Sequence, residues 1–228
     1  MDAHLKLISS LREEPFFCNM TPAVVASIEE YVYFRAYEPR QVIYFPENNC
    51  DHVYWVHEGR VKITRTASDG RELTFRHLFS GDMFGEECLI ETGKRRSYAE
   101  ALVKTILYLI RADDFRRLAR EESELGLMLA KSLCHRTMEI EQVLATTVFS
   151  SVRSRLAWGL MRLYRRAPKA EDGSLRVTHQ ELASLIGATR ETTTSVLHGL
   201  REDGIIVMAN RSVTILDAVA LEQIAKGV

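Results

Sequence analysis

The spacing of hydrophobic and polar residues divides the chain into stretches with strand-like periodicity and stretches with helical periodicity. From about residue 32 to residue 110, short runs rich in β-branched and aromatic residues alternate with turn sequences such as Ser68-Asp69-Gly70. Short strands at this spacing predict an antiparallel sandwich, barrel or jelly roll. Helical spacing precedes this stretch in residues 4–14 and from Thr21 to about Tyr31, and it returns at residue 113. The predicted fold class is therefore α+β.

One long helix is expected from about Glu122 to Thr147, a stretch without proline and with a single glycine. Spacings of three and four residues indicate a seam that faces a second copy of the chain, whereas the alternative is a helix buried within its own chain. The predicted seam consists of Leu129, Leu133, Arg136, Ile140 and Val143. A flanking set is expected to pack on the β-domain: Leu127, Ala130, Cys134, Met138 and Leu144.

The C-terminal third contains a pair of short helices between Thr178 and Gly204. Thr178 and Glu181 have the spacing of a capping box, and Gly187 supplies the turn between the helices. The second helix has an apolar stripe behind a polar face, a pattern that favours helix-turn-helix DNA recognition over an ordinary helical hairpin. A helix over residues 151–166 and a strand over 175–178 precede the pair. Strands at 205–208 and 212–216 form a wing, and a closing helix follows Asp217.

Composition and charge fit this interpretation. The 228 residues are 46% hydrophobic and 27% charged, as in soluble globular proteins. Residues 150–228 carry a net charge of +3 and residues 1–149 a net charge of −4, which suits a C-terminal region that meets DNA phosphates. No apolar run is long enough to span a membrane and no secretory leader is recognised, so a cytoplasmic protein is expected.

Little in the sequence points to catalysis or a metal. The four cysteines lie far apart, which argues against zinc ribbons and a disulfide framework, and each is expected to be a buried or partly buried packing residue. A glycine-rich nucleotide loop, metal-ligand spacing and the G-x-S-x-G motif are all missing from the sequence. We therefore expect a protein that is not an enzyme and has no metal site.

The order of β-roll, long helix and winged helix-turn-helix resembles the cyclic-AMP receptor/FNR family of bacterial transcription regulators over nearly the whole chain. The resemblance implies an effector-sensing β-roll domain at 1–121, a dimerisation helix and hinge at 122–149, and a winged helix-turn-helix domain at 150–228. It also implies a homodimer on a two-fold symmetric DNA site, with RNA polymerase as a further partner. The alternative function is a ligand-binding regulatory module that acts through protein contacts rather than DNA.

The sequence IGATRETTTSVLHGLREDGII resembles the family's G-x-[ST]-R-E-T-[VT] recognition helix. In this chain Ser195 stands where many members have a second arginine, so the half-site is expected to differ in part. By this resemblance, the base-reading residues are Arg190, Glu191, Thr194 and Ser195. The phosphate contacts are Thr178, His179, Gln180, Thr189, Thr192 and His198.

Residues 79–102, FSGDMFGEECLIETGKRRSYAEAL, resemble the phosphate-binding cassette of cyclic-nucleotide domains. The resemblance implies that Gly85, Glu86, Arg96 and Ser97 bind the effector. Ile140 and Glu141 stand where nucleotide-binding members have threonine and serine, so a cyclic nucleotide and another or no small ligand remain alternatives. An iron–sulphur cluster is not expected because Cys18 alone lies near the N-terminus, and no haem-ligand pair matches. The cofactor is therefore left unassigned.

Overall fold

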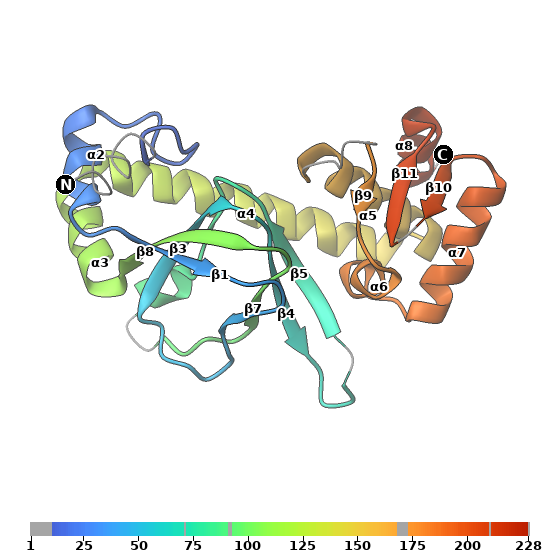
Figure 1. Cartoon of the computed structure of the whole chain (residues 1–228), viewed down its shortest axis with the longest axis horizontal. Coiled ribbons are helices and arrows are strands. Elements are labelled where there is room, and N and C mark those ends of the chain that lie inside the picture. Colours follow the sequence, from blue (N-terminus) through green and yellow to red (C-terminus); the bar gives the residue numbers. More distant parts are fainter. Residues whose placement is uncertain (1–10, 71, 91–92, 168–172, 210, 228) are drawn as a thin grey trace. The chain divides into compact units, whose positions relative to one another are not determined.

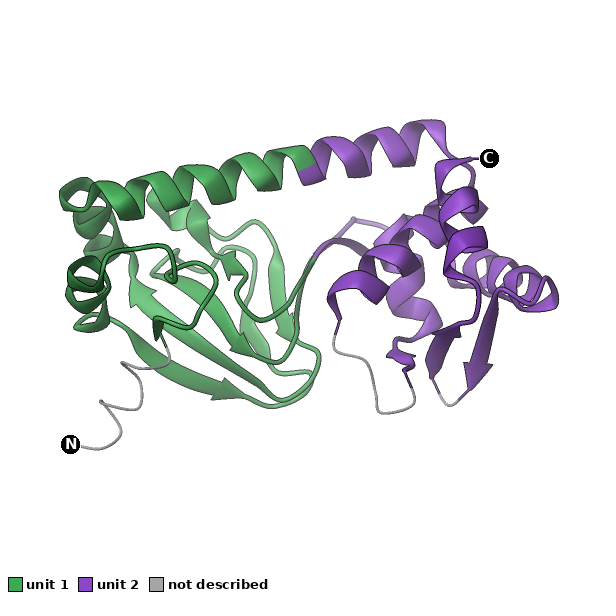
Figure 2. Cartoon of the chain, turned by 90° about the horizontal axis from the view of Figure 1, so that it is seen from above, with its two compact units in different colours: residues 1–64, 77–138 green, residues 65–76, 139–228 purple. Residues whose placement is uncertain are grey.

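A computed structural model describes residues 11–70, 72–90, 93–167, 173–209 and 211–227. The chain divides into two compact units, one of residues 1–64 and 77–138 and the other of residues 65–76 and 139–228 (Figure 2). The expected helix at 4–14 and the expected loop at 168–173 lie largely outside the described residues. No helix in the described ranges is long and apolar enough to cross a membrane.

An antiparallel β-roll is present, as predicted; most of it belongs to the first unit, and residues 65–76 of it are counted with the second (Figure 1). Within the described residues, one sheet has the strand order β1-β8-β3-β6 and the other has the order β2-β7-β4-β5. The strands are β1 (Tyr33–Tyr37), β2 (Val42–Tyr44), β3 (His52–Glu58), β4 (Val61–Thr66), β5 (Glu72–Leu78), β6 (Met83–Phe84), β7 (Tyr98–Ala101) and β8 (Thr105–Arg111).

Strand β3 lies between two hydrophobic clusters. Val53 and Trp55 point into the cluster that α2 (Pro22–Glu29) and α3 (Ala112–Glu121) help to form, and both are fully buried. Tyr54 and Val56 point into the other cluster, which also contains residues of the second sheet. Successive side chains of a strand point to opposite faces, so a strand covered on both faces is apolar at consecutive positions.

Helix α4 (Ser123–Phe149) is continuous, as predicted, but its faces differ from the prediction. The flanking set expected to pack on the β-domain is exposed: Leu127, Ala130, Cys134, Met138 and Leu144. That prediction is wrong, because the stripe turned inward begins instead at Leu125 and Leu129, which pack against the core. Of the predicted seam, Leu133 and Ile140 are exposed, whereas Arg136 and Val143 are half-buried.

The second unit surrounds α5 (Val152–Arg166), whose buried residues include Leu156, Leu160 and Leu163. Ser151 caps this helix by accepting a hydrogen bond from the Ser154 backbone N–H. Helix α5 packs against the other helices of the unit, and a small antiparallel sheet has the order β10-β11-β9. These elements are β9 (Leu175–Arg176), α6 (His179–Ile186), α7 (Arg190–Glu202), β10 (Ile206–Ala209), β11 (Ser212–Ile215) and α8 (Ala218–Lys226).

The expectation for the cysteines holds for two of the four. Cys88 is buried and Cys50 is half-buried, whereas Cys18 and Cys134 are exposed, so the prediction was wrong for the latter pair. Burial also raises the pKa of the Cys88 thiol to about 12, which keeps it protonated and favours a packing role. Across the described part of the chain, no group of three or more His, Cys, Asp or Glu residues is arranged to hold a metal ion.

Candidate nucleic-acid interface and effector site

The first helix of the predicted pair begins with the expected capping box. The Thr178 hydroxyl accepts a hydrogen bond from the Glu181 backbone N–H at 3.2 Å, and Glu181 Oε2 accepts one from the Thr178 backbone N–H at 2.7 Å. These contacts satisfy N–H groups that the start of a helix leaves without partners. Gly187 ends α6 at φ +64°, a left-handed conformation in which a residue without Cβ is unstrained.

Helix α7 follows this turn and is capped by Thr189, whose hydroxyl accepts from the Thr192 backbone N–H at 3.1 Å. Because Thr189 is the N-cap, Arg190 and Glu191 occupy the first two positions of the helix. Their side chains are exposed, and both project from the helix end whose free N–H groups favour an anion.

The two faces of α7 differ as the sequence pattern predicted. Thr193, Leu197 and Leu200 are fully buried and hold the helix against its own unit. The opposite face carries the predicted base-reading residues, of which Thr194 is half-buried and Ser195 is exposed. One face of this short helix is therefore polar and accessible, while the apolar face packs against the rest of the unit.

Positive side chains converge beside the start of α7. His179 of α6 and Thr194 of α7 share a hydrogen bond of 2.9 Å between Nδ1 and Oγ1, which ties the two helices together at the polar face. The pKa of His179 lies below its usual range because of burial, and then because of the nearby charges of Arg190 and His198. Arg190 therefore places a positive charge beside His179, which favours an anion at this face.

The residues predicted to hold phosphates are placed in different settings. Gln180 is exposed, and His198 is half-buried on the same face as Thr194. The hydroxyls of Thr178, Thr189 and Thr192 already take part in cap contacts, the last two at 2.9 Å from one another. The caps fix the backbone N–H groups at the starts of both helices. These threonines therefore hold the two helix starts in place, in addition to being predicted phosphate contacts.

In the β-roll, the predicted cassette forms a tight turn followed by a short 3₁₀ helix, Glu86–Leu89. Gly85 precedes it at φ +83°, and a Cβ there would lie only 2.9 Å from Arg95 Nη1 and 2.9 Å from the Tyr54 ring. Both the backbone conformation and the crowding therefore require glycine at this position. Glu86 is buried and forms an ion pair with Arg136 of α4, so the cassette is joined directly to the long helix.

The two adjacent arginines of the cassette have different environments. Buried positions alternate at Arg95, Ser97, Ala99 and Ala101, whereas Arg96 is exposed. This period of two is that of the strand β7, and it continues through the two buried positions before the strand's start, Arg95 and Ser97. The alternation was visible in the sequence, since two alanines mark the inward face, and it identifies Arg95 as a buried residue that the motif comparison missed.

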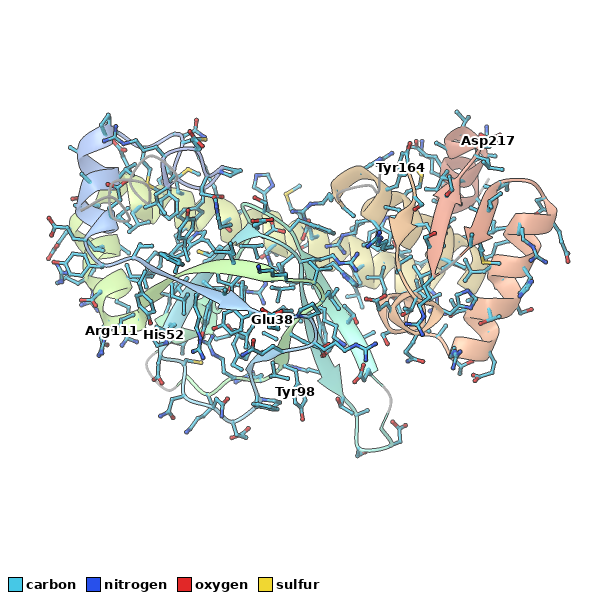
Figure 3. All side chains as sticks on the ribbon, viewed as in Figure 1. Glu38, His52, Tyr98, Arg111, Tyr164 and Asp217 are labelled. Carbon is cyan, nitrogen blue, oxygen red and sulfur yellow. The ribbon has the colours of Figure 1, made fainter. Side chains whose placement is uncertain are left out.

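Arg95 is held by backbone carbonyl groups and by a carboxylate. Its Nη1 donates to the Gly85 carbonyl oxygen at 2.9 Å, and its Nη2 donates to the carbonyl oxygen of His52 at 2.5 Å. His52 lies beside Arg111 in the register of β3 with β8 (Figure 3). Glu87 Oε2 completes the set at 3.3 Å from Nη1. These contacts fix the cassette's first turn to strand β3.

Aromatic rings surround the same guanidinium. Its central carbon lies 4.3 Å from the centroid of the Tyr44 ring, and Tyr54 stacks on Phe84 with 4.9 Å between ring centroids. Burial raises the pKa of Tyr54 to about 12 and raises that of Tyr44 as well, so both phenols stay neutral. A cation held among neutral rings and carbonyl oxygens is a rigid support for the effector site.

Comparison with known proteins decides the family. The cyclic nucleotide-binding domain family matches residues 34–122, and the Crp-like helix-turn-helix domain family matches residues 154–224. The cyclic AMP receptor protein of Thermus thermophilus is 32% identical over 218 residues, covering 95% of this chain and 99% of the relative. The chain belongs to the Crp family of transcription regulators.

Other Crp-family proteins match over similar lengths. A CRP-like cAMP-activated global transcriptional regulator of Mycobacterium tuberculosis is 29% identical, covering 92% of this chain and 96% of the relative. The solved structure of a CRP-family transcriptional regulator from Thermus thermophilus has a TM-score of 0.74 at 28% identity, covering 84% of this chain and 96% of that chain. The predicted fold and the predicted function as a DNA-binding regulator are thereby confirmed.

Membership in the Crp family assigns a task to each unit. The C-terminal unit carries the helix-turn-helix that binds DNA, and the N-terminal unit carries the effector-binding fold. The homodimer is typical of the family, and α4 carries exposed apolar residues. The ion pair between Glu86 and Arg136 connects the effector fold with that helix.

Proposed function

We propose that Arg190 and Glu191 read the edges of one G·C base pair step in each half-site of a two-fold symmetric DNA. The observation that supports this proposal is their exposed position at the start of α7. The opposite face of that helix is buried against its own unit. Arginine donates two parallel hydrogen bonds to guanine O6 and N7, and a glutamate accepts from cytosine N4. Thr194 and Ser195 contact neighbouring bases, and the short Ser195 side chain leaves one base less strictly specified.

Backbone phosphates are held around this contact. Gln180, His179 and His198 reach them with side chains, while the caps at Thr178 and Thr189 aim backbone N–H groups at them. Arg190→Ala should reduce discrimination between the specific site and random DNA by about tenfold to a hundredfold, whereas non-specific binding remains. Unchanged discrimination by this variant would refute the assignment of Arg190.

We propose a cyclic nucleotide as the effector of the β-roll. The relatives named above as cAMP receptor and cAMP-activated regulator support this choice, as does the match to the cyclic nucleotide-binding domain. Arg96 and Ser97 would bind the phosphate, and the carboxylate of Glu86 would accept from a ribose hydroxyl. Glu86 would then contact both the sugar and Arg136, so ligand binding would weaken or strengthen the ion pair that joins the cassette to α4.

Titration calorimetry with cyclic AMP and cyclic GMP tests the effector. Binding that Arg96→Ala weakens by at least tenfold, while Arg35→Ala on strand β1 leaves it unchanged, is the expected result. Absence of any heat with either nucleotide would reject the cyclic-nucleotide proposal without touching the DNA-binding assignment.

The surface proposed for the homodimer is the exposed apolar face of α4. Met138 and Leu144 are 65% and 62% exposed, and Leu127 and Cys134 extend the same exposed set toward the start of the helix. Leu133 and Ile140 lie on the same side of the helix as Leu144, at spacings of seven and four residues. Two such helices side by side place two copies of α7 for successive major grooves, about 34 Å apart. The proposed location is the cytoplasm, where the regulator meets DNA and RNA polymerase, and no enzymatic activity is proposed.

A further inference from the structure

A cavity of 380 Å³ lies in the first unit, where strand β3 begins and strand β8 ends. Residues 50–52, residues 111–113 and Arg116 line it, and none of them belongs to the residues proposed to bind DNA or a cyclic nucleotide. His52 and Arg111 are paired across the two strands, and Figure 3 shows them side by side. The volume falls within the range of about 300–1,000 Å³ that is usual for small-ligand pockets.

The charged groups that line this cavity balance in number. They are the carboxylates of Asp51 and Asp113 and the guanidinium groups of Arg111 and Arg116. Two of the four are paired with each other, since Arg116 Nη2 forms an ion pair with Asp113. The Nη1 atom of Arg116 donates to the Cys88 carbonyl oxygen at 2.8 Å. With no net charge in the lining, a ligand that is only an anion or only a cation meets as much repulsion as attraction.

The other two charged groups have no close partner. Within the described ranges, the Asp51 carboxylate forms no hydrogen bond or ion pair. Arg111 Nε lies 3.9 Å from Asp114 Oδ2, which is beyond hydrogen-bond distance, and Asp114 also lies 3.8 Å from Arg117 Nη2. The backbones of the two groups are adjacent, because the Asp51 carbonyl oxygen accepts from the Ala112 N–H at 2.9 Å. One negative and one positive group are therefore available to the same small ligand.

The rest of the lining is uncharged. Burial lowers the pKa of His52 more than the neighbouring Asp51 raises it, so the imidazole is neutral at neutral pH. Its ring lies edge-on to Tyr33, with 5.8 Å between the ring centroids. Burial raises the pKa of the Cys50 thiol, which stays protonated. A neutral ring and a thiol can contact the uncharged part of a ligand.

We infer that this cavity binds a free α-amino acid. Such a ligand carries an ammonium group and a carboxylate on one carbon, which matches an unpaired carboxylate and a loosely held guanidinium group on neighbouring strand ends. Asp51 accepts hydrogen bonds from the ammonium group, and Arg111 donates to the carboxylate. The side chain of the amino acid lies against Cys50 and the ring of His52.

Backbone contacts connect the cavity with the cassette. Arg116 donates to the carbonyl oxygen of Cys88 in the 3₁₀ helix, and Arg95 donates to the carbonyl oxygen of His52. An amino acid held between the ends of β3 and β8 restrains both contacts. The cavity is therefore a second effector site, and its occupancy is felt in the 3₁₀ helix of the cassette.

Titration calorimetry of the full-length protein with a panel of proteinogenic L-amino acids tests this proposal in the absence of nucleotide and DNA. Saturable binding of at least one amino acid is the expected result. The N-acetyl derivative of that amino acid lacks the ammonium group, and its amide lacks the carboxylate. Each derivative should bind at least tenfold more weakly than the free amino acid, because each loses one of the two charged contacts.

Matched variants show which side chain meets which group. Asp51→Asn should weaken binding of the free amino acid and of the amide at least tenfold, and leave the N-acetyl derivative unaffected. Arg111→Gln should weaken binding of the free amino acid and of the N-acetyl derivative, and leave the amide unaffected. A residue with a purely structural role would weaken all three ligands alike. Glu38→Gln and Arg120→Gln remove the same charges from exposed positions outside the cavity and should bind as wild type.

Hydrogen exchange measures the connection with the cassette. The bound amino acid should slow amide exchange in residues 86–89, and unchanged exchange there would overturn the role as a second effector site. The binding proposal is overturned by no saturable binding of any amino acid, by equal affinity for the free amino acid and its two derivatives, or by wild-type affinity in both Asp51→Asn and Arg111→Gln. None of these results bears on whether a cyclic nucleotide binds the cassette or Arg190 reads DNA.

Discussion

Glu86 of the cassette and Arg136 of α4 form an ion pair in which the carboxylate is buried and the guanidinium is one-third exposed. A buried carboxylate that loses its partner is costly, whereas replacing both charged groups by neutral ones costs less. The pair therefore joins the effector fold to the long helix through a contact that depends on both charges.

Removing one partner of this pair should destabilise the protein. Arg136→Met takes the guanidinium away from the buried Glu86 carboxylate, and we expect the free energy of unfolding to fall by about 1–3 kcal/mol. The double variant Glu86→Gln/Arg136→Met should recover part of this loss, which urea denaturation of the double variant and both single variants would measure. If the two single losses simply add in the double variant, the pair is not coupled in solution.

Gly85→Ala separates backbone strain from crowding. An alanine at this φ is strained and its Cβ meets Arg95 and Tyr54 at 2.9 Å, so we expect a loss of about 2–4 kcal/mol of unfolding free energy. Gly70→Ala is the matched control, because Gly70 has φ +82° and nothing within 4 Å of the added Cβ. It should lose only about 1 kcal/mol. Equal losses in thermal denaturation would contradict the crowding at Gly85.

Arg190→Ala should reduce affinity for the specific DNA site by about tenfold to a hundredfold, since a bidentate contact to guanine contributes about 1–3 kcal/mol of discrimination. Arg201→Ala removes the same charge from the exposed last turn of α7, far from the helix start. This variant should weaken binding to the specific DNA and binding to random DNA to the same small extent. Fluorescence anisotropy with both DNAs at fixed salt would measure this difference.

The affinity for DNA should increase as pH falls through the titration of His179. Burial, Arg190 and His198 lower the pKa of His179, so the free protein keeps it neutral where an ordinary histidine, with a pKa of about 6.5, is half protonated. A phosphate beside the ring raises that pKa again, so DNA binding takes up a proton. Anisotropy titrations over a pH series should show this trend, and His179→Gln should flatten it.

The same lowered pKa has the opposite consequence for folding. The unfolded chain binds a proton at His179 at higher pH than the folded chain does, so this residue reduces the free energy of unfolding as pH falls below about 6.5. His179→Gln should remove that contribution in urea denaturation at two pH values. A wild-type pH dependence of both DNA binding and stability in this variant would assign the proton to another group.

Leu144→Glu should dissociate the homodimer. Leu144 is 62% exposed on α4, and a charge there would be buried without a partner at the interface between two helices. Sedimentation equilibrium should show a shift towards monomer by at least a hundredfold in dissociation constant. Val219→Glu on α8 is the control, since Val219 is 70% exposed and apolar but lies outside α4. A dimer that survives Leu144→Glu would place the interface elsewhere.

The elements of this protein could be predicted from local sequence because their causes are local. The capping box of Thr178 and Glu181 and the glycine turn at Gly187 involve residues a few positions apart, so the helix pair followed from the sequence. Alternating or continuous apolar runs likewise predicted the β-roll, and the cap at Asp217 predicted α8 (Figure 3).

The faces of α4 could not be predicted in the same way. Two apolar stripes run along this helix, and nothing local distinguishes the stripe that meets its own chain from the stripe that meets another. Leu129 packs against the core, whereas Met138 and Leu144 face outward, and this choice depends on where the β-roll places its own surface.

By itself the sequence determined which segments form helices and strands and which family they resemble, because capping, periodicity and turn chemistry act over a few residues. Only the tertiary structure decided that the Arg95 guanidinium meets Tyr44 and the carbonyl oxygen of His52, and that Glu86 meets Arg136. Such contacts join residues tens of positions apart. They are selected by the packing of the whole fold, to which no local pattern is sensitive.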